Sequence, residues 1–187
     1  MSERQTKLLI SIQINSVNMN YSLHSKLIHW LMSIMIIGML IIGFSLDAFQ
    51  PQQKACIHMI HKSTGVLLIA LVIIRLFMKF ISSYPPLPES TPKIVAQIAR
   101  WNILGLYLMM ILMPLSGFFM SLFSGHTVPF YGLFEISSVG KSAMIAGISH
   151  EFHEIGGYIF ALLIAGHFLG GLFHHFILKD NVLRRML

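Results

Sequence analysis

Four long apolar stretches constrain the fold of this 187-residue chain more than any other feature. An α-helix needs about 20 mostly apolar residues to cross a bilayer. We expect such helices over residues 27–46, 57–80, 98–123 and 152–178. Charged residues make up 11% of the chain, against about 25% in soluble domains, so lipid must cover most of the surface. The predicted fold is an all-α membrane protein, a bundle of four transmembrane helices.

The segments between these stretches have the composition of loops. Residues 82–88 contain three prolines and cannot continue a helix. Residues 124–142 contain three glycines and one proline, which again favours a loop. Pro114 lies inside the third stretch and predicts a kink, which membrane helices tolerate. No boundary between domains is indicated within the four-helix region.

The distribution of positive charge predicts the orientation. If both termini are cytoplasmic, every Lys and Arg falls on the cytoplasmic side except Lys54, Lys62 and Lys141. This bias agrees with the positive-inside rule, and it argues against nucleic acid as the partner of a chain with net charge +6. The first stretch is expected to be an uncleaved helix. We therefore predict a cytoplasmic tail over 1–26, a four-helix domain over 27–178 and a second cytoplasmic tail over 179–187.

Histidines within the apolar stretches are the strongest indication of function, because ionisable side chains are costly inside a membrane. His153 and His167 are fourteen residues apart. At about 3.6 residues per turn this is close to four turns, so both side chains project from one face. At about 1.5 Å per residue they lie about 21 Å apart along the axis. This spacing suits two cofactors stacked one above the other.

The topology predicts a partner for each of these two histidines. The cytoplasmic level holds His29 and His167, and the outer level holds His61 and His153. Two imidazoles on one haem iron leave no open position, which favours electron transfer over oxygen chemistry. The single cysteine, Cys56, excludes a four-cysteine iron–sulfur site and covalent haem attachment. The prediction is two non-covalent haem b groups, with these four histidines as the metal ligands.

Other histidines have weaker claims. His58 and His150 are alternative ligands, although His150 lies about 100° away from the ligand face of its helix. His174 and His175 lie near the cytoplasmic end, where an imidazole could relay protons to a quinone. The alternative for this pair is an interfacial role beside Lys179.

Arginine and glycine residues near the histidines have two interpretations each. Arg75 could bind haem propionates, because guanidinium matches carboxylate geometry, or it could only anchor the topology. Glycines near the ligands could make room for a flat macrocycle or let helices approach closely. These are Gly65, Gly156, Gly157, Gly166, Gly170 and Gly171.

Several of these segments together resemble the bacterial cytochrome b561 family. The resemblance covers nearly all of the chain after the N-terminal tail, and rests on residues 27–30, residues 58–65, the His153–His167 spacing and residues 173–181. It implies a four-helix bundle in the bacterial inner membrane, two b haems with bis-histidine ligation, and electron exchange with quinone. The most similar members look like superoxide oxidases, which pass electrons from superoxide at the outer face to ubiquinone.

The predicted function is therefore that of an oxidoreductase between an outer-face donor and membrane quinone. The candidate catalytic residues are Lys62, which could attract an anionic donor together with Lys54, and His174 and His175. One alternative is the membrane-anchor cytochrome b subunit of a dehydrogenase or hydrogenase. Another is a non-haem transporter or metal permease that uses the histidines as ligands. The expected partners are lipid, quinone and the donor, and the sequence leaves a homodimer open.

Overall fold

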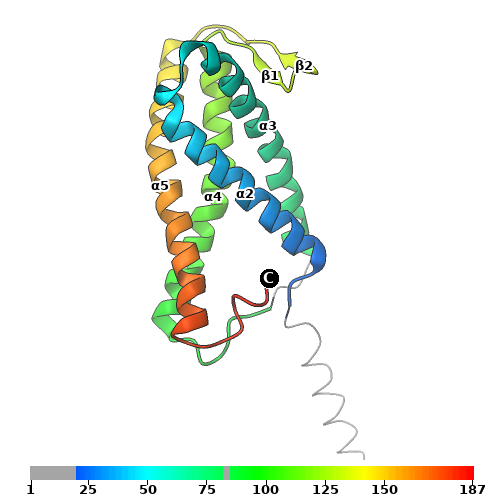
Figure 1. Ribbon diagram of the computed structural model, residues 1–187, viewed down its shortest axis with the longest axis vertical. Helices are drawn as coiled ribbons and strands as arrows, with labels where there is room; N and C mark the ends of the chain where they lie inside the picture. The colour runs from blue at the N-terminus through cyan, green and yellow to red at the C-terminus, as the bar shows by residue number, and fades with distance from the viewer. Residues whose placement is uncertain (1–19, 82–84) are drawn as a thin grey trace, which may run out of the picture.

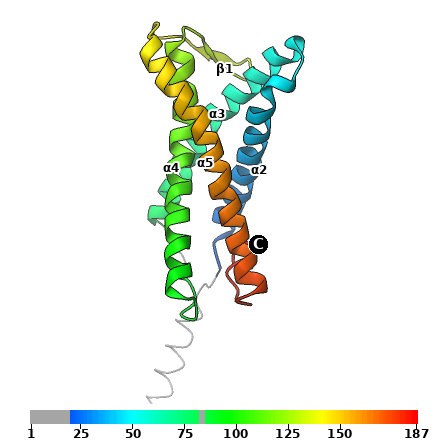
Figure 2. The same cartoon turned by 90° about the vertical axis from the view of Figure 1, so that its left-hand side faces the viewer.

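Four long helices dominate the computed structural model, which describes residues 20–81 and 85–187. They are α2 (Leu23–Ser45), α3 (Pro51–Ile81), α4 (Lys93–Phe123) and α5 (Ala143–Phe176), with a short 3₁₀ turn η1 (Leu46–Ala48) between the first two. Each is long and apolar enough to cross a membrane. Figures 1 and 2 show the four running along the long axis of the molecule. The predicted four-helix membrane bundle is confirmed, while most of the predicted N-terminal tail lies outside the described residues.

All four helices begin before the apolar stretches that predicted them, since polar residues can form their first turns. Helix α5 begins at Ala143, nine residues before the predicted position 152. Its N-cap is Ser142, whose hydroxyl accepts a hydrogen bond from the backbone N–H of Ile145. Ser22 caps α2 in the same way. Such caps satisfy backbone donors that have no partner within the helix. Helix α4 continues through Pro114.

A small hairpin lies between α4 and α5, where the sequence predicted only a loop. Strands β1 (Val128–Phe130) and β2 (Phe134–Ile136) are antiparallel, with Phe130 opposite Phe134. The turn between them includes Tyr131 and Gly132, both with positive φ. The hairpin is too short to hold its place alone. It packs against α3, where the fully buried Ser63 accepts a hydrogen bond from the backbone N–H of Tyr131 at 2.9 Å.

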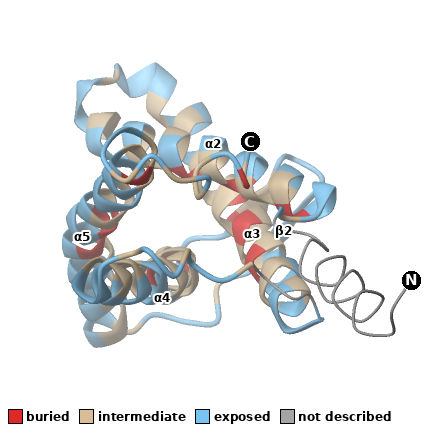
Figure 3. Ribbon diagram, turned by 90° about the horizontal axis from the view of Figure 1, so that it is seen from below, coloured by how far each residue is buried: buried red, intermediate tan, exposed pale blue. Residues whose placement is uncertain are grey.

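The apolar core is small and most of the helix surface is exposed, as lipid solvation requires. Buried residues from all four helices form the core: Met32, Ile36, Leu68, Val72, Met109 and Phe160. Large apolar side chains face outwards, for example Phe80 with 85% of its surface exposed and Leu162 with 74%. Figure 3 shows most of each helix as exposed or intermediate. Only a bilayer can solvate so much apolar surface.

Helix α5 packs closely against one neighbour and loosely against another. Of the helices that the structure describes, α4 and α5 share the most extensive contact, whereas α2 and α5 approach at few points. The start of α2 and the C-terminal residues meet at one end of the bundle, where the backbone N–H of Tyr21 donates to the carbonyl of Arg185. The hairpin lies at the opposite end (Figure 1). Helix α5 carries two of the histidines described next, His153 and His167.

Candidate functional site

Two pairs of histidine rings face each other across the bundle. His29 on α2 lies opposite His167 on α5, with ring centroids 6.1 Å apart. His61 on α3 lies opposite His153 on α5, with ring centroids 6.2 Å apart. Helix α5 therefore contributes one imidazole to each pair. These are the same pairs that depth in the membrane predicted.

The spacing of both pairs suits one metal ion between two imidazoles. A nitrogen–metal bond of about 2.0–2.1 Å on each side, plus about 1.1 Å from nitrogen to ring centre, gives about 6.2 Å between centroids. Among the residues that the structure describes, no group of three or more His, Cys, Asp or Glu side chains could hold a metal ion. A cofactor that supplies its own equatorial ligands fits two-imidazole sites of this kind.

In the His61–His153 pair, the ring of His153 is held by polar groups of α4. Nδ1 of His153 lies 3.0 Å from the carbonyl oxygen of Met113 and 3.0 Å from the hydroxyl of Ser116. The carbonyl can only accept, so Nδ1 carries the proton and Nε2 is left free to bind a metal. Within the described residues, the buried Nδ1 of His61 has no hydrogen-bond partner. Both observations fit the binding of iron.

The His29–His167 pair has a cationic neighbour instead. A terminal guanidinium nitrogen of Arg75 lies 3.1 Å from Nδ1 of His29. Guanidinium only donates, so Nδ1 accepts and the ring proton is on Nε2. If iron bound to Nε2 of His29, the ring proton would move to Nδ1. Arg75 could then no longer donate to Nδ1 and would turn to another acceptor. The buried Nε of Arg75 has no partner among the described residues, so the side chain retains a donor for a propionate.

The glycines differ in what surrounds them. A Cβ at Gly117 would lie 3.0 Å from the ring of His153, and one at Gly43 would lie 3.7 Å from the ring of His61. A Cβ at Gly156 would lie 2.8 Å from the sulfur of Met113, so this glycine lets α4 and α5 approach. Gly170, by contrast, has open space around it. The glycines that border the ligand rings, Gly43 and Gly117, were not among those singled out from the sequence.

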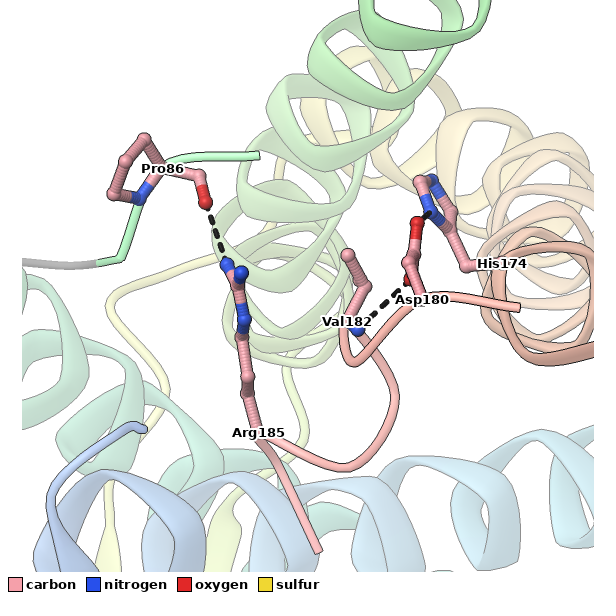
Figure 4. Close-up of polar contacts among 5 residues, drawn as sticks. All are labelled: Pro86, His174, Asp180, Val182 and Arg185. Atoms are coloured by element: carbon pink, nitrogen blue, oxygen red, sulfur yellow. Dashed lines mark hydrogen bonds and ion pairs between the residues drawn. The ribbon is translucent and has the colours of Figure 1, made fainter. Parts of the chain in front are cut away.

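His174 and His175 occupy different environments despite being adjacent. His174 is buried, with 4% of its surface exposed, and its Nδ1 lies 2.6 Å from a carboxylate oxygen of Asp180. Figure 4 shows Asp180 on the segment that follows α5, turned back towards this imidazole. His175 is half-buried and its ring lies edge-on to that of Phe176. Only His174 is thus fixed by a polar partner in the described residues.

Lys62 lines a pocket of about 240 Å³ at the hairpin end of the bundle. Its ammonium group lies 3.5 Å from the carbonyl oxygen of Thr127. His58 and His126, both exposed, line the same pocket. His58 thus lies in a surface pocket next to the His61–His153 pair. A pocket with one ammonium and two imidazoles suits a small anion.

Sequence reasoning missed three polar residues that hold the candidate site together. Ser116 contacts His153, and Asp180 binds His174. Ser63, which lies two residues after His61, fixes the hairpin. Serines within apolar stretches were the available signal for the first two, because a hydroxyl in a membrane needs a partner. Asp180 lies in a segment predicted as a tail, and its proximity to His174 depends on how that segment folds back.

Comparisons with known proteins agree with this geometry. The family description "Prokaryotic cytochrome b561" matches residues 20–187. The chain is 31% identical to cytochrome b561 homolog 2 of Escherichia coli K12, over 89% of this chain and 90% of that protein. It is 29% identical to a Yersinia pestis protein named "Probable superoxide oxidase CybB", over 86% and 91%. Cytochrome b561 homolog 1 of E. coli K12 is 26% identical, over 86% and 92%. The chain belongs to the prokaryotic cytochrome b561 family of multi-pass membrane proteins, whose cofactor is haem b.

Proposed function

We propose that this protein carries electrons across the membrane on two b haems, one held by His61 and His153 and the other by His29 and His167. The observation that carries the proposal is the pair of facing imidazoles at each of two levels of the bundle, 6.1 and 6.2 Å between ring centroids. A haem iron supplies one-electron chemistry when bound. The two imidazoles of each pair would hold the haem and leave no position on the iron for a substrate, so substrates would exchange electrons without binding the iron.

The orientation follows from the charges at the two ends. The end with His29, the C-terminus and most of the Lys and Arg residues is proposed to face the cytoplasm, in accordance with the positive-inside rule. The hairpin end, with Lys54, Lys62 and Lys141, then faces outwards. In this orientation the His61–His153 pair serves the outer face and the His29–His167 pair the inner one.

We propose superoxide as the outer donor. The pocket that Lys62 lines adjoins the helix turn of His61, and its positive and imidazole groups suit a small anion. A relative that this chain matches over most of its length is named a probable superoxide oxidase. Each superoxide would lose one electron and leave as dioxygen. The pocket is too small for a redox protein, which would dock on the surrounding surface instead.

Membrane quinone is the proposed acceptor at the inner end. Two electrons and two cytoplasmic protons convert one quinone to quinol, which balances the oxidation of two superoxide anions. His174 is the buried titratable side chain closest in sequence to the inner ligand His167 on the same face of α5. It is therefore the residue that we propose gives a proton to quinone, with His175 nearer the surface.

The deciding experiment combines haem stoichiometry with turnover. The purified protein should contain two haem b per chain in a pyridine haemochrome assay. It should also reduce a short-chain ubiquinone when superoxide is generated by xanthine oxidase. Two haems without superoxide-driven reduction would retain the cytochrome and reject the donor. A colourless protein that gains no haem on reconstitution would reject the proposal.

A further inference from the structure

The last nine residues of the chain, which were predicted to be a tail, pack against the rest of the protein. We call residues 179–187 the C-terminal strap. The backbone carbonyl of Met186 accepts a hydrogen bond from the indole of Trp30 on α2 at 2.9 Å. Arg185 is buried, with 4% of its surface exposed, and its guanidinium donates to the carbonyl of Pro86 in the α3–α4 connection. The strap thus joins α5 to α2 and to the α3–α4 connection, and Figure 4 shows the second of these contacts.

Within the strap, Asp180 is held in one orientation. One carboxylate oxygen accepts a hydrogen bond from the backbone N–H of Val182 at 2.9 Å. The other lies 2.6 Å from Nδ1 of His174. In return, the backbone N–H of Asp180 donates to the carbonyl oxygen of His174 at 3.1 Å. Because hydrogen bonds hold both the second carboxylate oxygen and the backbone of Asp180, this residue fixes in turn the imidazole that it contacts.

The charges around Asp180 keep it ionised. Burial raises the pKa of its carboxyl, but the hydrogen bonds from His174 and the Val182 N–H, with the positive charges of His174 and Arg185, outweigh burial and lower the pKa. At neutral pH the carboxylate of Asp180 therefore accepts hydrogen bonds and does not donate them. Nδ1 of His174 must then carry a proton in both charge states of the ring. Nε2 is left as the nitrogen that can exchange a proton.

We infer that Asp180 is a positioning residue for proton delivery to the quinone, an inference that rests on the function proposed above. When His174 is an imidazolium, Nε2–H donates its proton to a quinone oxygen that has received electrons. The ring becomes neutral, retains Nδ1–H towards Asp180, and recovers a proton on Nε2 from cytoplasmic water. Asp180 stabilises the imidazolium and stays ionised throughout. A second proton transfer by the same route, to the other quinone oxygen, completes the quinol.

The first test compares the Asp180→Asn variant with a matched control, Glu89→Gln, which changes an exposed acid in the α3–α4 connection. Full-length protein is reduced by superoxide and then mixed with short-chain ubiquinone in a stopped-flow instrument. For Asp180→Asn, oxidation by quinone should slow about 100-fold, the lower end of what a positioned general acid contributes. Its pH profile should also change, because Asp180 no longer fixes which ring nitrogen of His174 carries the proton. Reduction by superoxide and the haem content should be unchanged, and the control should match the wild type.

The second test does not depend on quinone. Nitrogen-15 spectra of histidine-labelled protein, with His174 assigned by its absence from His174→Gln, report which ring nitrogen carries the proton. The wild type should show a hydrogen-bonded Nδ1–H at His174, and Asp180→Asn should show a mixture of tautomers. An Nε2–H tautomer in the wild type would overturn the inference. So would a variant that quinone oxidises with the same rate and the same pH profile as the wild type. If wild-type protein does not react with quinone, the proposed function fails, and the spectra still decide whether Asp180 positions His174.

Discussion

The two ends of the bundle hold the same pair of imidazoles in different surroundings. At the hairpin end, Nδ1 of His153 faces a backbone carbonyl and a hydroxyl. At the other end, Nδ1 of His29 faces the guanidinium of Arg75, and the C-terminal strap closes the same end of the bundle. The hairpin end has an open pocket beside its pair. The groups that contact the ligand ring are thus neutral at the hairpin end, which has an open pocket, and cationic at the other end, which the strap covers.

Under the proposed function, this difference would give a direction to electron transfer. A hydrogen bond from Nδ1–H to a carbonyl makes the imidazole a stronger donor and stabilises oxidised iron. A nearby guanidinium charge disfavours the additional positive charge of oxidised iron. We therefore expect the His61–His153 site to have the lower reduction potential, so that electrons move downhill from the outer site to the inner one.

Removing one ligand from each pair is the most severe test of the comparison. His153→Ala should lose the outer haem alone and His167→Ala the inner haem alone, since each pair lies at its own level. The haem content should fall from about two to about one per chain in each variant. Pyridine haemochrome measurements check this, with His150→Ala, an exposed position on the same helix, as the control. Retention of two haems by either variant would contradict the assigned pairs.

Changing the cation at the inner end should alter one potential only. Arg75→Gln should lower the midpoint potential of the inner haem by about 50–100 mV, as expected for the loss of one nearby charge at an intermediate effective dielectric constant. A redox titration followed by optical spectroscopy measures both haems. Lys79→Gln, which removes an exposed charge over the Tyr107 ring, is the control and should have a smaller effect. Equal shifts of both haems would remove the proposed difference between the ends.

The open pocket at the outer end should contribute to the rate of reduction rather than to a potential. Lys62→Gln should lower the rate of reduction by superoxide about threefold and weaken its dependence on salt, because one steering charge is lost. Lys54→Gln is the comparison, and should have less effect because Lys54 lies 3.6 Å from the carboxylate of Asp47. Stopped-flow rates at two ionic strengths measure this. A larger effect at Lys54 would place the donor site elsewhere on the outer face.

The smallest expected effect concerns the hydroxyl of Ser116, which contacts the ring of His153. Ser116→Ala removes one of the two acceptors near Nδ1, while the Met113 carbonyl remains. The outer midpoint potential should rise by about 20 mV, within what a weakened second-shell hydrogen bond can cause. The same redox titration measures it, and the inner haem serves as the internal reference. A fall in the outer potential would show that the hydroxyl acts as a donor.

The four helices and the pairing of the histidines could be predicted because both depend on short-range regularities. Apolar length decides whether a helix can span a bilayer, and the rise per residue fixes the depth of each side chain. These two facts were enough to place His29 with His167 and His61 with His153. The helix starts were predicted less well, because interfacial polar residues such as Ser142 cap helices outside the apolar stretches.

The contacts between those histidines and their polar partners could not be predicted, since they depend on how separate segments pack together. Ser116 and His153 belong to different helices. Ser63 holds a hairpin in a region that was predicted to be a loop because of its glycines and proline. Asp180 is only six residues from His174, but it contacts the imidazole because the chain reverses after α5. No periodicity in the sequence encodes that reversal.

The sequence by itself determined a four-helix membrane protein with paired histidines at two depths, since apolar length and helical rise act along one segment at a time. Only the tertiary structure decided what surrounds each pair: a carbonyl and a hydroxyl at His153, a guanidinium at His29, and a strap that brings Asp180 to His174. The physical reason is that hydrogen bonds and charges act over a few ångströms, and packing alone decides which distant residues come that close.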